Sequence, residues 1–167
     1  MPNYLSFFTI ESNVLAIAWF SASCYIQDTK NIIYNPIIRG AILNYMIVTM
    51  IVFFALLTGQ FSNINFINSY GLHLIMPIAY ILDWFIKKPK SKIETKSAFY
   101  WLIYPIIYLA YALIRGRITN WYPYLFLTPE NGSYLNVAKY SVGLLIFFML
   151  IILIIYFLNN KLAKSAK

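Results

Sequence analysis

Long apolar runs separated by short polar stretches dominate this chain. A membrane-spanning helix needs about 20 mostly apolar residues at a rise of 1.5 Å each. Five stretches satisfy this, at about 6–26, 39–58, 70–86, 98–114 and 137–158. The alternating pattern of about 10 residues that marks transmembrane β-strands is absent from the sequence. The pattern predicts an all-α, polytopic integral membrane helix bundle, with residues 1–167 forming a single transmembrane domain of five helices.

Composition supports the same class. Hydrophobic residues make up 61% of the 167 and charged residues 11%, which is far more apolar than a soluble domain of this size needs for its core. One cysteine cannot form an internal disulfide, and one histidine cannot build a multi-histidine metal or haem site within one chain. We therefore expect no metal and no cofactor.

The positive charges predict the orientation. With five spans, one side of the membrane holds ten of the thirteen Lys and Arg residues and the other side holds three. The ten are Lys30, Arg39, Lys87, Lys88, Lys90, Lys92, Lys96, Lys161, Lys164 and Lys167; the three are Arg115, Arg117 and Lys139. Positive residues accumulate in cytoplasmic loops, so the 87–97 loop and the C-terminus are predicted to be cytoplasmic. The formal charge of +8 then reflects topology, and no nucleic-acid partner is expected.

Residues 115–136 form the longest connection and mix Arg, Trp, Tyr and Pro. This composition is typical of a structured segment at the headgroup level, and we expect an outer cap there.

Polar residues recur on one face of the first span. Thr9, Ser12, Asn13, Ala16 and Ser23 follow helical spacing and form a stripe of small and polar side chains. Because lipid offers these groups no hydrogen-bond partners, the stripe is predicted to face other helices.

The third span carries the only histidine, His73, on a face shared with Pro77, Tyr80 and Trp84. Pro77 has no N–H for the carbonyl of His73, so we expect a kink there. Both the first and third spans run inward from the outer side, which places Thr9 and His73 at one depth near the outer leaflet.

An ionisable residue inside a span indicates a functional site, and a neutral imidazole can take the proton of a threonine hydroxyl. The alternative is structural: Thr9 would be a helix cap or packing residue and His73 an interhelical donor. Asp83 lies about 15 Å along the helix from His73 and Glu11 points to another face, so neither is expected to orient the imidazole. Asn13 is the expected supporting residue, orienting a side chain or donating to an oxyanion, and Glu130 in the cap is a further candidate.

At these residues the sequence resembles a known family. The segments are S-F-F-T-I-E-S-N at 6–13, G-L-H-x-x-x-P-x-x-x-x-x-D-W at 71–84, W-L-I-Y-P at 101–105, R-G at 115–116 and W-Y-P-Y at 121–124. In this order they are similar to the androgen-induced-gene and androgen-dependent TFPI-regulating protein family, in its bacterial branch. The resemblance implies a transmembrane threonine hydrolase that cleaves fatty acid esters of hydroxy fatty acids, with Thr9 and His73 at the two catalytic positions.

One difference from the family is the span count. Family members usually have six spans, with a helix before the catalytic threonine, whereas only residues 1–6 precede this motif. Two interpretations stay open, a truncated start and a short member of the family.

The sequence thus predicts a lipid ester hydrolase in the cell membrane, with substrate reaching the site from the bilayer. Thr9 would be the nucleophile and His73 the base. Ser12, Asn13, Arg115, Trp121 and Tyr122 would bind substrate or support the site, with Arg115 holding a carboxylate through two parallel hydrogen bonds. The alternative is a non-enzymatic membrane protein that binds or transports lipid, or a partner subunit, in which the polar stripe serves packing. The sequence does not indicate an oligomeric state.

Overall fold

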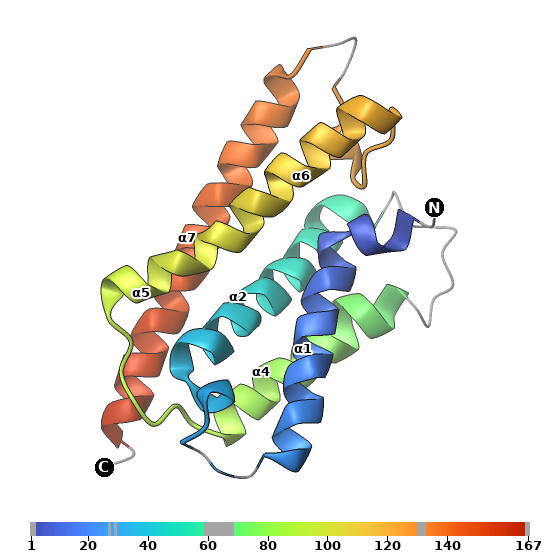
Figure 1. The fold of residues 1–167 in the computed structure, drawn as a ribbon. Coiled ribbons are helices and arrows are strands. Elements are labelled where there is room, and N and C mark those ends of the chain that lie inside the picture. The colour runs from blue at the N-terminus through green and yellow to red at the C-terminus, as the bar shows by residue number, and fades with distance from the viewer. Residues whose placement is uncertain (1–2, 27, 29, 59–68, 130–132, 166–167) are drawn as a thin grey trace.

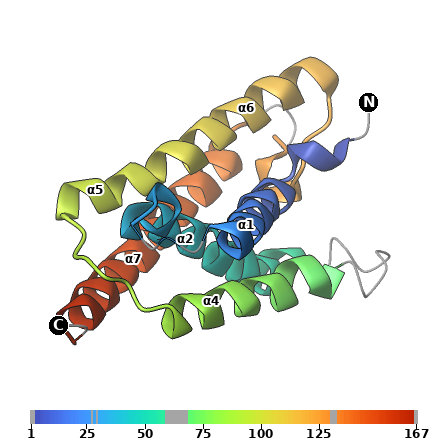
Figure 2. The same ribbon diagram turned by 60° about the horizontal axis from the view of Figure 1, so that its bottom comes forward.

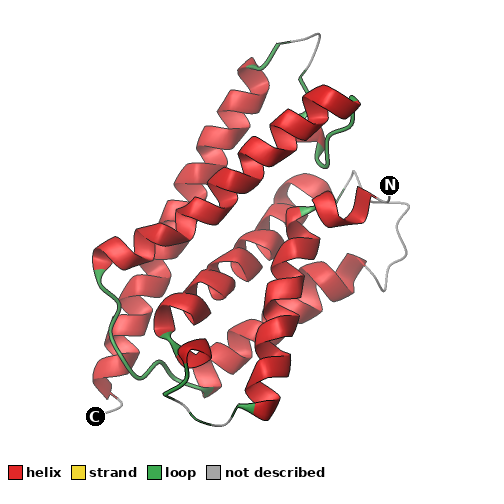
Figure 3. Cartoon of the chain, in the orientation of Figure 1, coloured by secondary structure: helices red, strands yellow, loops and turns green. Residues whose placement is uncertain are grey.

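All regular elements of the described chain are helical. A computed structural model describes residues 3–26, 28, 30–58, 69–129 and 133–165, and Figures 1 and 3 show these ranges as helices joined by loops. The long helices are α1 (Phe8–Tyr25), α2 (Pro36–Val52), α4 (Met76–Ile86), α6 (Ile103–Thr119) and α7 (Leu135–Ser165). The predicted all-α class is confirmed.

Short elements extend or connect these helices. They are the 3₁₀ helices η1 (Asn3–Ser6), η2 (Ile32–Tyr34), η5 (Tyr100–Leu102) and η6 (Leu125–Leu127), and the short helix α5 (Thr95–Phe99). Two turns are π-helical, η3 (Phe53–Leu57) after α2 and η4 (Gly71–Ile75) before α4. The start of α2 follows directly from its sequence, because the Asn35 side chain accepts from the Ile37 N–H and Pro36 occupies the first turn.

Three helical stretches are long and apolar enough to cross a membrane. They are Pro36–Leu57, Thr95–Thr119 and Leu135–Ala163, with 22, 25 and 29 residues. The predicted third span corresponds to Gly71–Ile86, which is apolar but shorter. The predicted first span corresponds to α1, whose 18 residues include Glu11, Ser12 and Asn13 near their start and are therefore less apolar. The predicted cap at 115–136 begins too early, since α6 continues to Thr119.

The helices form two groups with α2 between them. Figures 1 and 2 show α1, α2 and α4 together, while α6 and α7 lie on the other side of α2. In the span that contains α2, 56% of the side chains are buried, compared with 22% in each of the spans formed by α6 and α7. The apolar residues of α6 and α7 therefore cover much of the outside of the bundle, as expected of helices that face lipid.

The polar stripe of α1 lies inside the bundle. Thr9, Ser12, Asn13 and Ala16 are all buried, which confirms that this part of the stripe meets other helices, whereas Ser23 is half-buried and donates to the Phe20 carbonyl of its own helix. The predicted face of the third span is buried as well, with His73, Pro77, Tyr80 and Trp84 turned inward. The polar stripe of α1 and the face of η4 and α4 that carries His73 are thus the faces through which these helices pack against the rest of the bundle.

A charged cluster joins α1, α2 and α4 at the end of the group away from Thr9. Arg39 is 3% exposed, and its Nη2 lies 3.2 Å from Asp83 Oδ2. Lys87 Nζ lies 3.0 Å from Asp83 Oδ1. The guanidinium of Arg39 and the ammonium of Lys87 lie 5.1 and 5.0 Å from the ring centroid of Trp19. We call Trp19, Arg39, Asp83 and Lys87 the Arg39 cluster.

Candidate active site

Thr9 lies in the first turn of α1, and its side chain is not a helix cap. The N-cap residue is Phe7, and no side chain caps this end of the helix. The structural interpretation of Thr9 as a cap is therefore wrong. Thr9 is 5% exposed, and its Oγ1 lies 3.1 Å from Nε2 of His73. The predicted contact between these two side chains across the first and third helices is confirmed.

The imidazole of His73 is held by the main chain. Its Nδ1 lies 2.8 Å from the carbonyl oxygen of Ser69. A carbonyl only accepts hydrogen bonds, so Nδ1 carries the proton and Nε2 presents its lone pair. The hydroxyl of Thr9 therefore donates to Nε2, which is the arrangement in which a neutral histidine can remove a hydroxyl proton.

Two π-helical turns bring His73 and an aromatic partner together. His73 lies in η4, and Phe53 is the first residue of η3. Their rings stack with centroids 4.0 Å apart and planes 19° apart. The kink predicted before Pro77 takes the form of η4, where the N–H of Met76 bonds to the carbonyl of Gly71, five residues back. Such turns often occur at functional sites, because they redirect side chains without ending the helix.

Tyr124 is a site residue that the sequence analysis missed. Its hydroxyl lies 3.4 Å from Thr9 Oγ1 and accepts from the Thr9 backbone N–H at 3.3 Å. Tyr124 is 5% exposed, and burial raises the pKa of its phenol, so the hydroxyl keeps its proton at neutral pH. The signal for it was present, since Tyr124 ends the W-Y-P-Y segment at 121–124.

Asn13 supports the site through the backbone. Its Nδ2 donates to the carbonyl of Thr9 at 2.7 Å and to the carbonyl of Leu72 at 3.1 Å. It thereby joins the start of α1 to the turn that carries His73. Because both of its amide hydrogens go to main-chain carbonyls, the suggestion that Asn13 donates to an oxyanion is wrong, and its orienting role remains.

Ser12 and the nearby carboxylates point away from the imidazole. Ser12 Oγ donates to main-chain carbonyls of its own helix and lies 3.1 Å from Thr49 Oγ1 of α2, so it ties α1 to α2. Glu11 accepts from the Tyr104 hydroxyl. Asp83 belongs to the Arg39 cluster. As predicted, neither acid orients His73, and Glu130 lies outside the described residues.

Arg115, Trp121 and Tyr122 fold the cap and do not line the pocket beside Thr9. Arg115 lies in α6, donates to Asn3 Oδ1 at 2.7 Å, and places its guanidinium 4.7 Å from the ring centroid of Trp121. Tyr122 packs on Gly116 so closely that a Cβ there would lie 2.1 Å from the ring. Of the two predicted roles, binding substrate or supporting the site, the observed contacts of these three residues correspond to the second, because they hold the cap in which Tyr124 lies.

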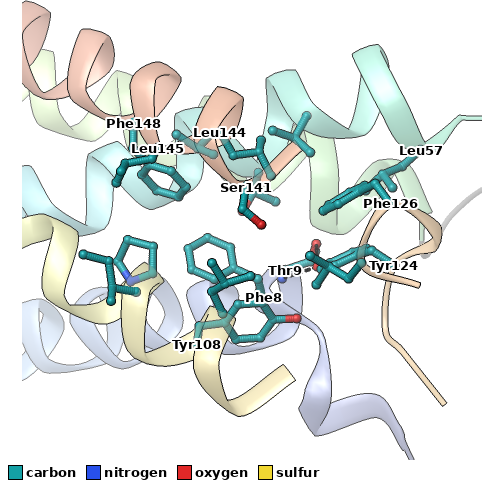
Figure 4. A pocket seen from close by; sticks show the side chains of 17 residues that line it. Phe8, Thr9, Leu57, Tyr108, Tyr124, Phe126, Ser141, Leu144, Leu145 and Phe148 are labelled. Atoms are coloured by element: carbon teal, nitrogen blue, oxygen red, sulfur yellow. Dashed lines mark hydrogen bonds between the residues drawn. The ribbon is translucent and has the colours of Figure 1, made fainter. Parts of the chain in front are cut away.

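An apolar pocket of about 100 Å³ adjoins Thr9. Figure 4 shows Thr9 and Tyr124 at one end and Leu144, Leu145 and Phe148 of α7 along the opposite wall. Its lining residues come from α1, α2 with η3, α6, the cap and α7: Phe8, Thr9, Val48, Thr49, Val52, Leu57, Pro105, Ile106, Tyr108, Leu109, Tyr124, Phe126, Leu127, Ser141, Leu144, Leu145 and Phe148. Polar groups are few, and those of Thr9 and Tyr124 meet at one place.

The arrangement defines a class of site: a threonine hydroxyl hydrogen-bonded to a neutral imidazole, beside an apolar pocket. Comparisons with protein-family models, with curated protein sequences and with solved structures found no match to this chain.

Proposed function

We propose that this protein is an integral membrane hydrolase that cleaves lipid esters, with Thr9 as nucleophile and His73 as general base and acid. The observation that carries the proposal is the 3.1 Å contact between Thr9 Oγ1 and His73 Nε2 at the wall of an apolar pocket. A buried Thr–His contact used for packing alone needs no fixed tautomer and no adjacent space for a ligand. Here the Ser69 carbonyl fixes the tautomer and the pocket supplies the space.

The reaction follows acyl transfer chemistry. Thr9 Oγ1 bonds to the ester carbonyl carbon as its proton passes to His73 Nε2. The tetrahedral intermediate expels the alcohol, which takes that proton from His73, and an acyl-threonine remains. Water then attacks the acyl carbon and gives its proton to Nε2, and the carboxylic acid leaves as Thr9 regains its hydrogen. The Ser69 carbonyl stabilises the transient imidazolium in place of an acidic residue.

The pocket favours an acyl chain as the bound group. Its walls are aliphatic and aromatic, and four lining residues come from each of α6 and α7, which lie in the two apolar stretches with the smaller buried share. A chain dissolved in the bilayer would reach it without crossing water. The resemblance to transmembrane threonine hydrolases supports fatty acid esters of hydroxy fatty acids as the first substrates to test.

The proposal includes a five-helix arrangement in the cell membrane. The 87–97 loop, the N-terminal end of α2 and the C-terminal end of α7 carry most of the Lys and Arg and would be cytoplasmic, and Thr9 and His73 would lie near the outer leaflet. α1 and α4, which are shorter or less apolar, would be shielded from lipid in part by α2 and by one another.

Turnover of a panel of lipid esters by purified protein tests the proposed function. Thr9→Ala and His73→Ala should each lower turnover by about 10²–10⁴-fold, the range for losing a positioned base. Because the two residues act as a unit, the double variant should lose little more than either single variant. Thr9→Ser should keep part of the activity because the hydroxyl remains.

Ser23→Ala is the matched control, since it removes a hydroxyl from the same helix that bonds to the Phe20 carbonyl far from the pocket. It should behave like wild type. Ester hydrolysis at the wild-type rate in both Thr9→Ala and His73→Ala would refute the dyad.

A lipid-binding protein without catalysis is the second candidate, and the apolar pocket is the observation that favours it. It predicts saturable binding of fatty acid or ester with no turnover, unchanged by Thr9→Ala. The same purified proteins decide between the two functions.

A further inference from the structure

The hydrogen bonds around Thr9 have one consistent direction. The Ser69 carbonyl requires the proton of His73 to be on Nδ1, so the Thr9 hydroxyl donates to Nε2. That hydroxyl has a single hydrogen, so in the 3.4 Å contact with Tyr124 the phenol is the donor and Thr9 Oγ1 the acceptor. The Thr9 N–H in turn donates to the phenol oxygen. Tyr124 therefore points its hydrogen at the atom that would attack the substrate.

We propose that Tyr124 is a catalytic residue that donates a hydrogen bond to the oxyanion of the tetrahedral intermediate, together with the Thr9 backbone N–H. This inference rests on the proposed hydrolase function and adds a third catalytic group to it. In the resting site the N–H donates to the phenol oxygen, and the phenol hydrogen is donated to Thr9 Oγ1. Both are buried donors next to the nucleophile, which is where an oxyanion site must lie.

The reaction itself makes the Tyr124 O–H available to a new hydrogen-bond acceptor. When a lone pair of Thr9 Oγ1 forms the new bond to the carbonyl carbon, that oxygen becomes a poor acceptor. The carbonyl π electrons move at the same time to the substrate oxygen, which becomes a strong acceptor within reach. The Tyr124 O–H turns from one oxygen to the other without losing its proton. When the intermediate collapses, the C=O bond re-forms and the hydrogen bond weakens.

The other tyrosine on the pocket wall near Thr9 is committed elsewhere. Tyr108 donates to the main-chain carbonyl of Ser6 at 2.9 Å. Tyr124 has no such carbonyl partner among the hydrogen bonds of the described residues: its hydroxyl contacts the N–H and Oγ1 of Thr9 and also interacts with the Tyr108 hydroxyl and the Phe8 backbone. The position of α1 strengthens the case, because the first turn of a helix favours negative charge at its N–H groups.

Tyr124→Phe tests the inference, because it removes only the hydroxyl. We expect kcat to fall by about 10²-fold, as when one oxyanion donor is lost, with KM little changed. Tyr45→Phe is the matched control: Tyr45 is also 5% exposed, and its hydroxyl bonds to the Trp101 carbonyl at 2.9 Å, outside the pocket. It should keep the wild-type kcat.

A sulfur substitution in the substrate separates an oxyanion role from a structural one. In a thionoester the carbonyl oxygen is sulfur, a weak hydrogen-bond acceptor, so wild type should hydrolyse it much more slowly than the ester. If Tyr124 donates to that atom, the ratio of the ester to the thionoester hydrolysis rate should be smaller in Tyr124→Phe than in wild type. The substitution has already removed the hydrogen bond that sulfur would weaken. Tyr45→Phe should keep the full ratio.

The outcomes distinguish this inference from the proposed function. Loss of ester hydrolysis in Thr9→Ala with wild-type kcat in Tyr124→Phe would overturn the inference and leave the hydrolase. A lower kcat with an unchanged ester-to-thionoester ratio would also overturn it. Should Tyr124→Phe fail to fold, Tyr124→4-aminophenylalanine can replace it, because it keeps the ring and an N–H donor. A fall of the ester-to-thionoester rate ratio in that variant, although a donor is still present, would refute the oxyanion role. Absence of ester hydrolysis in the wild type would instead refute the proposed function.

Discussion

The two ends of the α1–α2–α4 group bury polar side chains in opposite ways. The Arg39 cluster holds full charges, which are paired within 3.2 Å and covered by Trp19. The Thr9 end holds neutral groups that share hydrogen bonds and adjoin a pocket. Buried charges must be compensated, which fixes them in place. Neutral donors and acceptors can exchange a proton, which is the property that the proposed hydrolysis would use at the Thr9 end.

Cysteine labelling tests whether these ends lie on opposite sides of the membrane, and its expected effect is the largest, near all-or-none. With Cys24 replaced by Ala, a cysteine at Thr119 should react with an impermeant reagent added outside intact cells. A cysteine at Lys90 should react only after the cells are opened. Both positions are exposed on the protein, so a difference between them reports the membrane. The reverse pattern would place Thr9 and His73 on the cytoplasmic side.

Removing one charge from the Arg39 cluster should affect stability and not chemistry. Asp83→Asn leaves Arg39 buried without its carboxylate, so the free energy of unfolding should fall by about 3–5 kcal/mol. Denaturant titration in mixed micelles measures this change. Protein that remains folded should hydrolyse ester at the wild-type rate, because the cluster lies far from the pocket.

The double variant Arg39→Met, Asp83→Leu serves as the control for this prediction. It removes both charges, so it should regain most of the stability lost in Asp83→Asn. If the free energy of unfolding falls by less than about 1 kcal/mol in Asp83→Asn, the Arg39–Asp83 pair is solvated. The two ends of the group would then not differ in how they bury charge.

Two helical glycines provide the smallest and most finely matched test. At Gly116 an added Cβ meets the ring of Tyr122, whereas at Gly143 of α7 it meets no atom within 4 Å. Gly116→Ala should push the cap outward, costing about 1–3 kcal/mol and moving Tyr124 away from Thr9, so that kcat falls too. Gly143→Ala should be neutral or stabilise by up to about 1 kcal/mol. Equal effects of the two substitutions would show that the cap does not depend on the Gly116 contact.

The helical class and the Thr9–His73 contact could be predicted from the sequence for physical reasons. Apolar runs of span length allow only helices in lipid, and helical spacing places Thr9, Ser12 and Asn13 on one face. The common entry direction of two spans then gives Thr9 and His73 the same depth. Spacing along a helix and alternation of direction are local rules, so they apply without knowledge of tertiary contacts.

The remaining parts of the site depend on backbone geometry that side-chain patterns do not record. The partner of His73 Nδ1 is the main-chain carbonyl of Ser69. Every residue has a main-chain carbonyl, so residue types do not indicate which one accepts the hydrogen bond. Trp121 and Tyr122 stood out as aromatic residues, yet the path of the cap makes Tyr124 the residue that reaches Thr9. The helices Phe8–Tyr25 and Gly71–Ile86 lie within two residues of the expected spans 6–26 and 70–86, whereas Thr95–Thr119 and Leu135–Ala163 extend beyond the expected 98–114 and 137–158.

The turn at Gly71–Ile75 has a consequence for how this gene can change over time. A π-helical turn holds one residue more than an α-helical turn, so deleting one residue there would restore a regular helix. It would also rotate everything on the N-terminal side by about 100° relative to α4. The stacking of His73 on Phe53 and the contact of His73 with Thr9 both depend on the present rotational position of this turn about the helix axis. Descendants of this sequence can gain or lose residues in loops, but a single-codon deletion in this segment would separate His73 from Thr9 without disturbing any apolar run.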